Sequence, residues 1–491
     1  MAKASNTSDS IIANAAALDE RAEERKAHLN QIFRREFDTI EQYHKTLDRP
    51  DLSFDELLKE YKTLGKRYES LLRQATKLLR TGDAAQRKLI GVQEELEWRQ
   101  NLNALWIAQF LAMVATNACN PMLPLYVRDL GITDAAQAQF WSGLVYAGPF
   151  FLSIFTVPLW GTLGDKHGRK TVIVRAIIGL TISLFLMSFA PSVEWLLAAR
   201  ILQGAVSGFI AASLGLVASS TPEKSSGYAM GFLQSSVSAG MVIGPLLGGL
   251  IADAIGVRKL FFIVSALCFI SAIVVIALVN EPNSGDESEE SFTVWDNLRF
   301  SAAMPAVRSL LVYVLVVQTA TMFTMPIMAY FLETLSTPPA ILATITGVMV
   351  GLVGILTTGF TVLWGRWNNK RPFEQTLLIA LPALAIATIA HAFMPHYQYV
   401  FPWRVVLGIF SGATIPTLYA ALTKATPAER RGGIMGLASS SVLLGNLLSP
   451  VLCSWTAVHL GMNWCFIVSG IFFVVPMPFI ALSYLRQRRT I

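Results

Sequence analysis

Charge is scarce in this chain of 491 residues. Only 15% of the residues are Asp, Glu, Lys or Arg, whereas 53% are hydrophobic. The mean hydropathy is +0.49, and a chain of that composition carries more apolar surface than a soluble domain can bury. These values exclude a soluble globular protein and predict that the chain sits in a membrane.

Cysteine is rare, and the usual signatures of catalysis are missing. The four cysteines fall in apolar segments without a close pair, so we expect buried hydrophobic residues and neither a disulfide framework nor a metal site. The chain has no phosphate-binding glycine loop, metal cluster or nucleophile triad. We therefore expect no cofactor, no metal and no enzymatic activity. The cysteines are Cys119, Cys268, Cys453 and Cys465.

Long apolar runs dominate the chain after about residue 101. Twelve of them are long enough to cross a hydrocarbon core of roughly 30 Å, which takes a helix of about 20 residues. The runs are continuous and do not alternate, which disfavours a β-barrel. We predict an all-α membrane protein with twelve transmembrane helices. The runs begin near Leu102, Phe140, Thr171, Trp195, Gly227, Lys259, Val307, Pro339, Phe373, Tyr399, Gly432 and Asn463.

Lys and Arg are concentrated in alternate loops. Because cytoplasmic loops retain the excess of Lys and Arg, we place the basic loops and both termini in the cytoplasm. The pI near 9.1 then reflects membrane topology, and we expect no nucleic-acid partner. The basic set consists of Lys166, Arg169, Lys170, Lys224, Arg366, Lys370, Arg371, Lys424, Arg430, Arg431, Arg486, Arg488 and Arg489.

Residues 1–100 differ from the rest because they carry many charges of both signs and no early apolar core of a signal peptide. Ser53 followed by Glu56 predicts a capping box at the start of a helix. Across residues 57–96, apolar positions recur at alternating steps of four and three, which is a heptad seam. Two interpretations stay open. One is a coiled coil that forms a homodimer or docks a cytosolic partner; the other is an intramolecular helical hairpin.

The membrane part contains an internal repeat. A shift of about 204 residues places Trp160 on Trp364 and Arg200 on Arg404. Each half holds six spans, so the repeats are parallel, as in rocker-type secondary transporters with a substrate cavity between the halves. The predicted domains are a cytosolic extension (1–100), a first six-helix bundle (101–280), a cytoplasmic linker (281–305) and a second six-helix bundle (306–491).

Several motifs resemble those of the major facilitator superfamily. "GTLGDKHGRK" is similar to the loop motif between its second and third spans, and Arg200 with Gln203 resembles a fourth-span motif of proton-coupled members. "GMVIGPLLGG" resembles the fifth-span antiporter motif, and "NPMLPLYVRDLGI" resembles the first-span pattern of twelve-span drug:proton antiporters. The resemblance covers roughly residues 101–489. It implies proton-coupled export of drugs or other amphipathic small molecules across the bacterial inner membrane by alternating access.

The resemblance also gives two motifs a role. The loop motif would be a conformational latch, in which Asp165 reaches cationic side chains or the partially positive N-terminus of a helix from the other half. The antiporter motif would let a neighbouring helix approach closely and seal the cavity against proton leak. The latch residues are Gly161, Asp165, Gly168, Arg169 and Lys170, and the antiporter residues are Gly240, Gly244, Pro245, Gly248 and Gly249.

No Asp or Glu lies near the middle of any span, so the residue that carries a proton is unassigned. Three acids, Asp129, Asp253 and Glu333, sit near the outer boundaries of the spans, where a solvated loop charge is the simpler interpretation. The proton-coupling candidates are Arg200, Gln203, Asp129, Asp253 and Glu333.

For the substrate, the seventh span offers methionines that form a soft, adaptable surface, and several other spans carry isolated polar residues. The lack of a charge cluster favours amphipathic or neutral compounds. Two alternatives stay open: a dedicated exporter of one endogenous metabolite such as a siderophore, and a transporter-like sensor that signals through the N-terminal coil. The cavity candidates are Asn117, Asn120, Gln234, Gln318, Met322, Met325, Tyr330, Arg404, Tyr419 and Asn446.

Overall fold

The structure, a computed structural model, describes residues 53–281, 294–368 and 370–489, and residues 34, 38, 41, 42, 44, 45, 48 and 51 singly. The chain divides into two units between Glu95 and Leu96. Most of the predicted linker, residues 282–293, lies outside the described residues.

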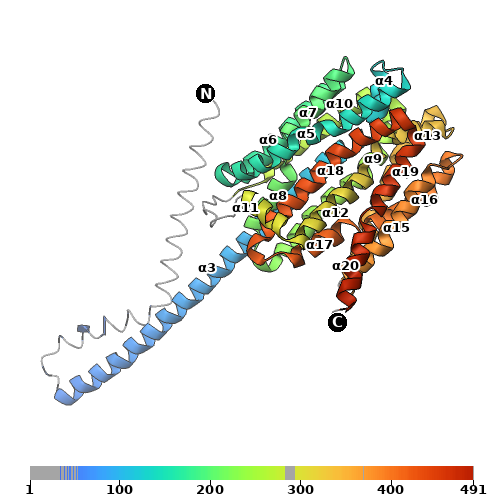
Figure 1. Ribbon diagram of the computed structural model, residues 1–491. Coiled ribbons are helices and arrows are strands. Elements are labelled where there is room, and N and C mark those ends of the chain that lie inside the picture. Colours follow the sequence, from blue (N-terminus) through green and yellow to red (C-terminus); the bar gives the residue numbers. More distant parts are fainter. Residues whose placement is uncertain are drawn as a thin grey trace, which may run out of the picture. The chain divides into compact units, whose positions relative to one another are not determined.

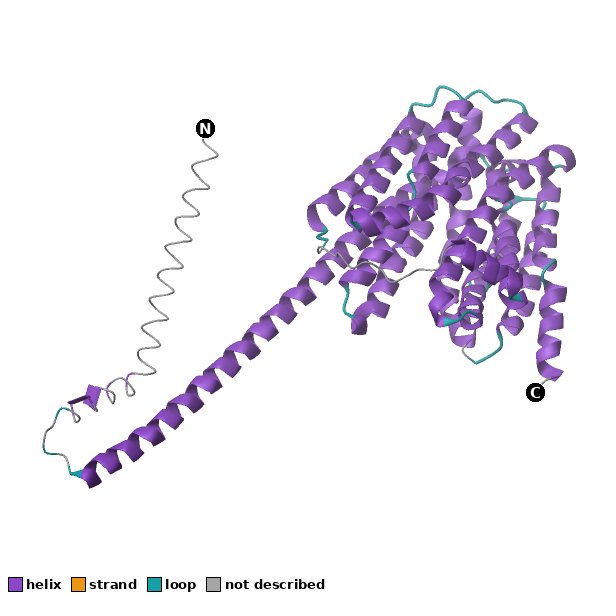
Figure 2. Cartoon of the chain, turned by 60° about the vertical axis from the view of Figure 1, so that its left-hand side comes forward, coloured by secondary structure: helices purple, strands orange, loops and turns teal. Residues whose placement is uncertain are grey.

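Every regular element among the described residues is a helix (Figure 2). Twelve helical segments are long and apolar enough to cross a membrane, which confirms the predicted count. The first half of the membrane part holds α3 (Phe54–Cys119), η1 (Asn120–Met122), α4 (Leu123–Asp129), α5 (Ala135–His167), α6 (Arg169–Ser188), α7 (Val193–Ala205), α8 (Phe209–Ser220), α9 (Glu223–Ile255) and α10 (Val257–Leu278). The second holds α11 (Val294–Ala303), α12 (Pro305–Met322), η2 (Met325–Ile327), α13 (Met328–Thr334), η3 (Pro339–Ile341), α14 (Leu342–Asn368), α15 (Phe373–His391), η4 (Tyr397–Tyr399), α16 (Val400–Ser411), α17 (Ile415–Ala425), η5 (Ala428–Arg430), α18 (Arg431–Leu460), α19 (Met462–Val474) and α20 (Met477–Arg489).

The outward-facing surfaces of the helices are apolar, which indicates that they lie in a membrane. Along α10, Phe261 and Val264 are buried, whereas Phe262, Ile270 and Ile276 are each about half exposed. A helix that is apolar on its outer face as well as on its inner face belongs in lipid. The four cysteines are free and buried, as predicted.

The internal repeat is also a repeat of hydrogen bonds. In the first half, Nε1 of Trp160 donates to the carbonyl oxygen of Ala205 at 2.8 Å, and in the second half Nε1 of Trp364 donates to that of Ile409 at the same distance. Both bonds tie the second span of a half to its fourth span. The sequence repeat therefore corresponds to one packing scheme used twice.

Two helix pairs join the halves. Helix α9 packs along α14. Helix α5 packs along α18 (Figure 1). Since α9 corresponds to α18 and α5 to α14 in the repeat, the two contacts are equivalent.

The end of the bundle that carries the turns at Gly131, Gly256 and Gly461 is called the outer end, because the basic loops predict that it faces outward. The opposite end is called the basic end.

The halves meet at the outer end and separate toward the basic end. At the outer end, Oγ of Ser454 donates to the carbonyl oxygen of Gln139 at 2.7 Å. Toward the basic end, glycines of α9, α14 and α18 face open space, because a Cβ placed on them would have no atom within 4 Å. The helices are thus arranged as in a transporter closed at its outer end. These glycines are Gly227, Gly231, Gly359, Gly365, Gly432 and Gly436.

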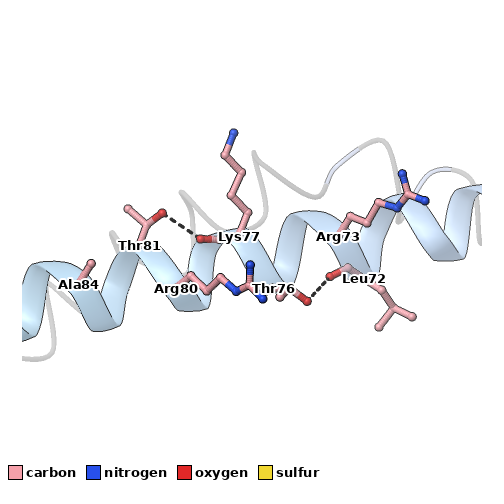
Figure 3. Close-up of a pocket in the computed structure, with 7 residues that line it drawn as sticks. All are labelled: Leu72, Arg73, Thr76, Lys77, Arg80, Thr81 and Ala84. Atoms are coloured by element: carbon pink, nitrogen blue, oxygen red, sulfur yellow. Dashed lines mark hydrogen bonds between the residues drawn. The ribbon is translucent and has the colours of Figure 1, made fainter.

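From Phe54 onward the first unit is one long helix, the portion of α3 before Leu96. One of the two bonds of the predicted capping box is present, since the carboxylate of Glu56 accepts from the backbone amide of Ser53 at 3.1 Å. The hydroxyl of Ser53 donates to the same carboxylate at 2.8 Å. The apolar seam is exposed along this portion, for example at Tyr68. Figure 3 shows basic side chains, among them Arg73 and Lys77, on the same stretch. The residues before 53 that the hairpin interpretation needs lie mostly outside the described part.

Candidate functional site

The latch motif is the end of a helix followed by a sharp turn. Helix α5 continues to His167, Gly168 has a φ of 93°, and α6 begins at Arg169. A φ of that sign favours glycine, which explains why glycine separates these helices. Gly161 and Asp165 lie on the last two turns of α5, and the side chain of Asp165 lies outside the described part of the structure.

A carboxylate does sit at the N-terminus of α6, and it comes from Glu281. The backbone amides of Arg169 and Lys170 donate to its two oxygens at 2.6 and 3.0 Å. A Cβ at Gly168 would lie 2.7 Å from the same carboxylate, so glycine also makes room for it. Helix N-termini stabilise negative charge. Sequence reasoning missed Glu281. Its position as the first acid after the sixth span was the one signal that could have pointed to it.

The two basic side chains of the motif hold the first half together. Arg169 donates from Nη1 to the carbonyl oxygen of Gly215 on α8, and Nζ of Lys170 donates to the carbonyl oxygen of Ile276 on α10 at 3.1 Å. These contacts stay within one half. A latch between the halves remains a prediction about Asp165.

Arg200 and Gln203, one helical turn apart on α7, form a buried pair. Nη1 of Arg200 donates to Oε1 of Gln203 at 2.7 Å, and its Nε donates to the carbonyl oxygen of Val145 on α5 at 3.1 Å. Only 3% of Arg200 is exposed. Burying a guanidinium in a membrane protein is costly unless acceptors are provided, and here an amide and a carbonyl provide them.

The antiporter motif is a close contact between two helices. Its glycine face packs on the first span: a Cβ at Gly244 would lie 2.8 Å from that of Asn117, and one at Gly248 would collide with the backbone of Ala118. On the adjacent face, the carbonyl group of Pro245 touches Gly347 of α14. Helix α9 is therefore held between the first span and the other half. Gly240 packs on Met113 in the same way, and Gly249 on Ala343.

Two of the three acidic candidates join the halves at the outer end. Asp253 of α9 accepts from the backbone amides of Ala343 and Thr344 at 3.1 and 2.7 Å, and so caps α14. Glu333 forms an ion pair with Arg128. The structure thus gives both acids a part in closing this end, whereas Asp129 is exposed there.

Tyr330 belongs to the same closure. Its hydroxyl donates to the carbonyl oxygen of Pro124 at 2.6 Å and lies 3.0 Å from the hydroxyl of Ser142. Both partners are in the other half. Of the cavity candidates, this one is a buried contact between the halves.

Two other cavity candidates are brought together. Nε2 of Gln318 donates to Oδ1 of Asn446 at 2.8 Å, which joins α12 to α18. Asn117 donates to its own helix, at the carbonyl oxygen of Met113. Oδ1 of Asn120 is buried and finds no hydrogen-bond partner in the described part of the chain. Of the others, Gln234 is exposed, while Met322 and Tyr419 are half-buried.

Met325 and Arg404 line a small cavity inside the second half. The same cavity is lined by His391, a buried residue that the sequence gave no reason to prefer. Arg404 is the repeat counterpart of Arg200, but the position of Gln203 is taken by Leu407. The two buried arginines therefore have different surroundings.

Two parallel six-helix halves, joined at one end around helices with tight glycine contacts, define a secondary transporter. The family model of the Major Facilitator Superfamily matches residues 105–403 and 310–490. The chain belongs to this superfamily; it is a multi-pass membrane transporter and not an enzyme.

Relatives and solved structures agree with this assignment. The chain is 31% identical to the "Multi-drug resistance efflux pump PmrA homolog" of Lactococcus lactis over 80% of this chain and 98% of the relative. It is 30% identical to "Multidrug resistance protein MdtG" of Klebsiella pneumoniae, over 76% of this chain and 91% of that protein. In fold it resembles a bacterial homolog of the human lysosomal transporter Spinster (TM-score 0.65, 18% identity, 79% of this chain and 97% of that chain covered). It also resembles a mutant of the nucleoside transporter NupG (TM-score 0.68, 14% identity, 78% and 99% covered).

Proposed function

We propose that this chain is a proton-driven exporter of amphipathic small molecules, drugs among them, in the bacterial inner membrane. The observation that carries the proposal is the likeness to the multidrug efflux pump homolog of L. lactis, which extends over 98% of that protein. The glycine contact of α9 on the first span supports it, because this is the place where the resemblance to antiporters lies.

Transport by alternating access requires the closed end to change. At the outer end, the contacts of Asp253, Glu333 and Tyr330 hold the halves together. These contacts must break before a substrate can leave on that side. The latch motif at the basic end then has to close, and we assign that step to Asp165.

Efflux measurements test the proposal. Cells that express the full chain should export ethidium while their proton gradient is intact and stop when a protonophore collapses it. Asp165→Asn should lower the efflux rate at least tenfold, since the carboxylate can no longer hold the basic end closed. Glu429→Gln is the matched control, because Glu429 is an exposed acid of the basic end outside the motif. Efflux that ignores the gradient would contradict proton coupling.

A dedicated exporter of one endogenous metabolite, such as a siderophore, is the second candidate. The named relatives are multidrug proteins, which is why we place it second. Deletion of the protein followed by analysis of the culture medium separates the two. Loss of one metabolite without any drug hypersensitivity would favour the dedicated exporter.

The exposed seam of α3 supports a contact of residues 57–96 with a second copy or a cytosolic partner, and it is also the feature that a sensor would use. Removing residues 1–91 tests these proposals together. Unchanged transport with loss of a cellular response would favour signalling. Cross-linking at Tyr68, an exposed position of the seam, between copies of the intact chain would favour a homodimer.

A further inference from the structure

A small cavity lies among α12, α14, α15, α16 and α19, inside the second half. It offers about 50 Å³ to water-sized molecules. One water needs roughly 10–15 Å³ of such space, so the cavity has room for a few waters, one halide ion or one carboxylate group. Its polar lining consists of Arg404, His391, Thr321, Thr324, Thr388, Ser411 and Ser469.

Arg404 lacks the acceptors that its charge needs. Only 4% of the residue is exposed. Its one hydrogen bond within the described part runs from Nη2 to Sδ of Met328 at 2.9 Å, and its Nε is buried without a partner. A thioether is a weak acceptor. A buried guanidinium without a carboxylate is costly inside a membrane protein, so this site favours an acceptor from outside the chain.

The first half shows what would satisfy such an arginine. Arg200 is equally buried, but it has the amide oxygen of Gln203 and the carbonyl oxygen of Val145. In the second half Leu407 stands where Gln203 would be, and it lines the cavity. The replacement of an amide by a leucine leaves the guanidinium open toward the cavity.

His391 faces the same space. Its Nδ1 lies 2.7 Å from the carbonyl oxygen of Ala387, which fixes Nδ1 as a donor. Nε2 is buried and has no hydrogen-bond partner among the residues that the structure describes. In the neutral ring Nε2 carries a lone pair, which repels an anion; in the protonated ring it is a donor, which attracts one. Arg404 is the other ionisable group among the residues that line the cavity.

We propose that this cavity binds a small anion or a carboxylate group at Arg404, and that His391 takes up a proton at Nε2 when the anion binds. The anion would accept from the guanidinium and from the imidazolium, so that the added proton balances its charge. The site extends the proposed transport function, because it offers a proton carrier where no span has a central acid. Its test does not depend on transport.

Binding is measured on the purified full-length chain with sodium bromide and sodium acetate as probes. Each probe should raise the thermal unfolding temperature in a saturable way, with an apparent affinity about a hundredfold higher at pH 6 than at pH 8, because protonation of His391 and anion binding favour each other. In a weakly buffered solution, about one proton should be taken up per anion bound. Preference for acetate would indicate a substrate carboxylate, and preference for bromide an inorganic ion.

Three variants separate the parts of the proposal. Arg404→Gln should abolish binding. Leu407→Gln keeps Arg404 but supplies the internal amide that Gln203 supplies to Arg200, so it should lower the anion affinity at least tenfold in a folded protein. His391→Gln should remove the proton uptake and the dependence on pH. Arg366→Gln, at an exposed arginine of the same half, should change nothing.

Separate results would refute the anion site and the role of His391. No saturable effect of either probe on the intact chain would refute the anion site, and so would full binding by Leu407→Gln. Anion binding without proton uptake would refute the role of His391 alone. Ethidium efflux is measured in a separate experiment. If no efflux is found, the anion-binding measurements on the purified chain can still be interpreted.

Discussion

The two halves of this transporter bury an arginine at the same place in the repeat, but they treat it differently. Arg200 donates to an amide and a carbonyl group, whereas among the described residues Arg404 donates to the sulfur of Met328 alone. The scaffold around them is shared, as the equal hydrogen bonds of Trp160 and Trp364 show. The comparison teaches that the repeat preserves how the helices pack, while single polar positions decide what each half can bind.

The largest expected effect comes from a substitution that disrupts the close packing of α9 on the first span. Gly248→Val should lower the free energy of unfolding by about 3 kcal/mol, because the new side chain must displace the backbone of Ala118. The second half has Cys453 at the corresponding position, so close backbone contact here is a property of one half only. Thermal unfolding of the purified chain measures the difference.

Gly432→Val is the matched control for that substitution. A Cβ at Gly432 meets no atom within 4 Å, so the stability should hardly change. Equal losses in both variants would mean that valine itself harms these helices, and the argument from packing would then be wrong.

The next largest effect is expected from two substitutions that exchange the residues beside Arg200 and Arg404. Gln203→Leu removes the acceptor 2.7 Å from Arg200 and should destabilise the chain by about 2 kcal/mol, the typical worth of a hydrogen bond to a charged group. Leu407→Gln should act in the opposite direction and stabilise by about 1 kcal/mol, because it supplies an acceptor to Arg404. If both changes shift the unfolding temperature in the same direction, the difference between the halves does not rest on this position.

Sequence reasoning predicted the parts of the fold that depend on composition and periodicity. Twelve apolar runs correspond to twelve spans, and the spacing of Gly240, Gly244 and Gly248 corresponds to a real helix contact. Hydropathy and glycine spacing are local signals, since they depend on the helix that carries them. For the same reason Ser53 and Glu56 could be recognised as a helix start.

What the sequence did not predict depends on which helices meet. Glu281 looked like one acid of a linker, and only the fold brings it to the amides of Arg169 and Lys170. Asp253 was a proton-coupling candidate, and the structure uses it to cap a helix more than eighty residues away in the chain. His391 can titrate near neutrality, but in the sequence it is a lone histidine near a helix end, which is more often an ordinary polar residue. Only the fold shows that it shares a cavity with a buried arginine.

A third prediction contrasts the closed outer end with the open basic end. Asp253→Ala removes the cap of α14 and should weaken the closed arrangement by about 1.5 kcal/mol, as is typical for loss of a helix cap. Spin labels at the exposed positions Thr133 and Ala340, one in each half, should then show a longer distance in a larger fraction of molecules. Asp129→Ala, an exposed acid of the same end, should leave the distances unchanged, and a matching change there would indicate a general effect of charge.

The smallest expected effect concerns the hydrogen bond that the two halves share, which Trp160 makes in the first half and Trp364 in the second. Trp160→Phe and Trp364→Phe each remove one hydrogen bond of 2.8 Å to the fourth span of the half, so each should lower the unfolding free energy by about 1 kcal/mol. The surroundings differ, because the guanidinium of Arg175 lies 3.2 Å from the ring centre of Trp160, whereas Trp364 packs beside Phe410. Phenylalanine retains a ring face for Arg175, so the two losses should remain similar in unfolding experiments. A clearly larger loss at Trp160 would mean that the cation contact, and not the repeated hydrogen bond, holds the second span of the first half in place.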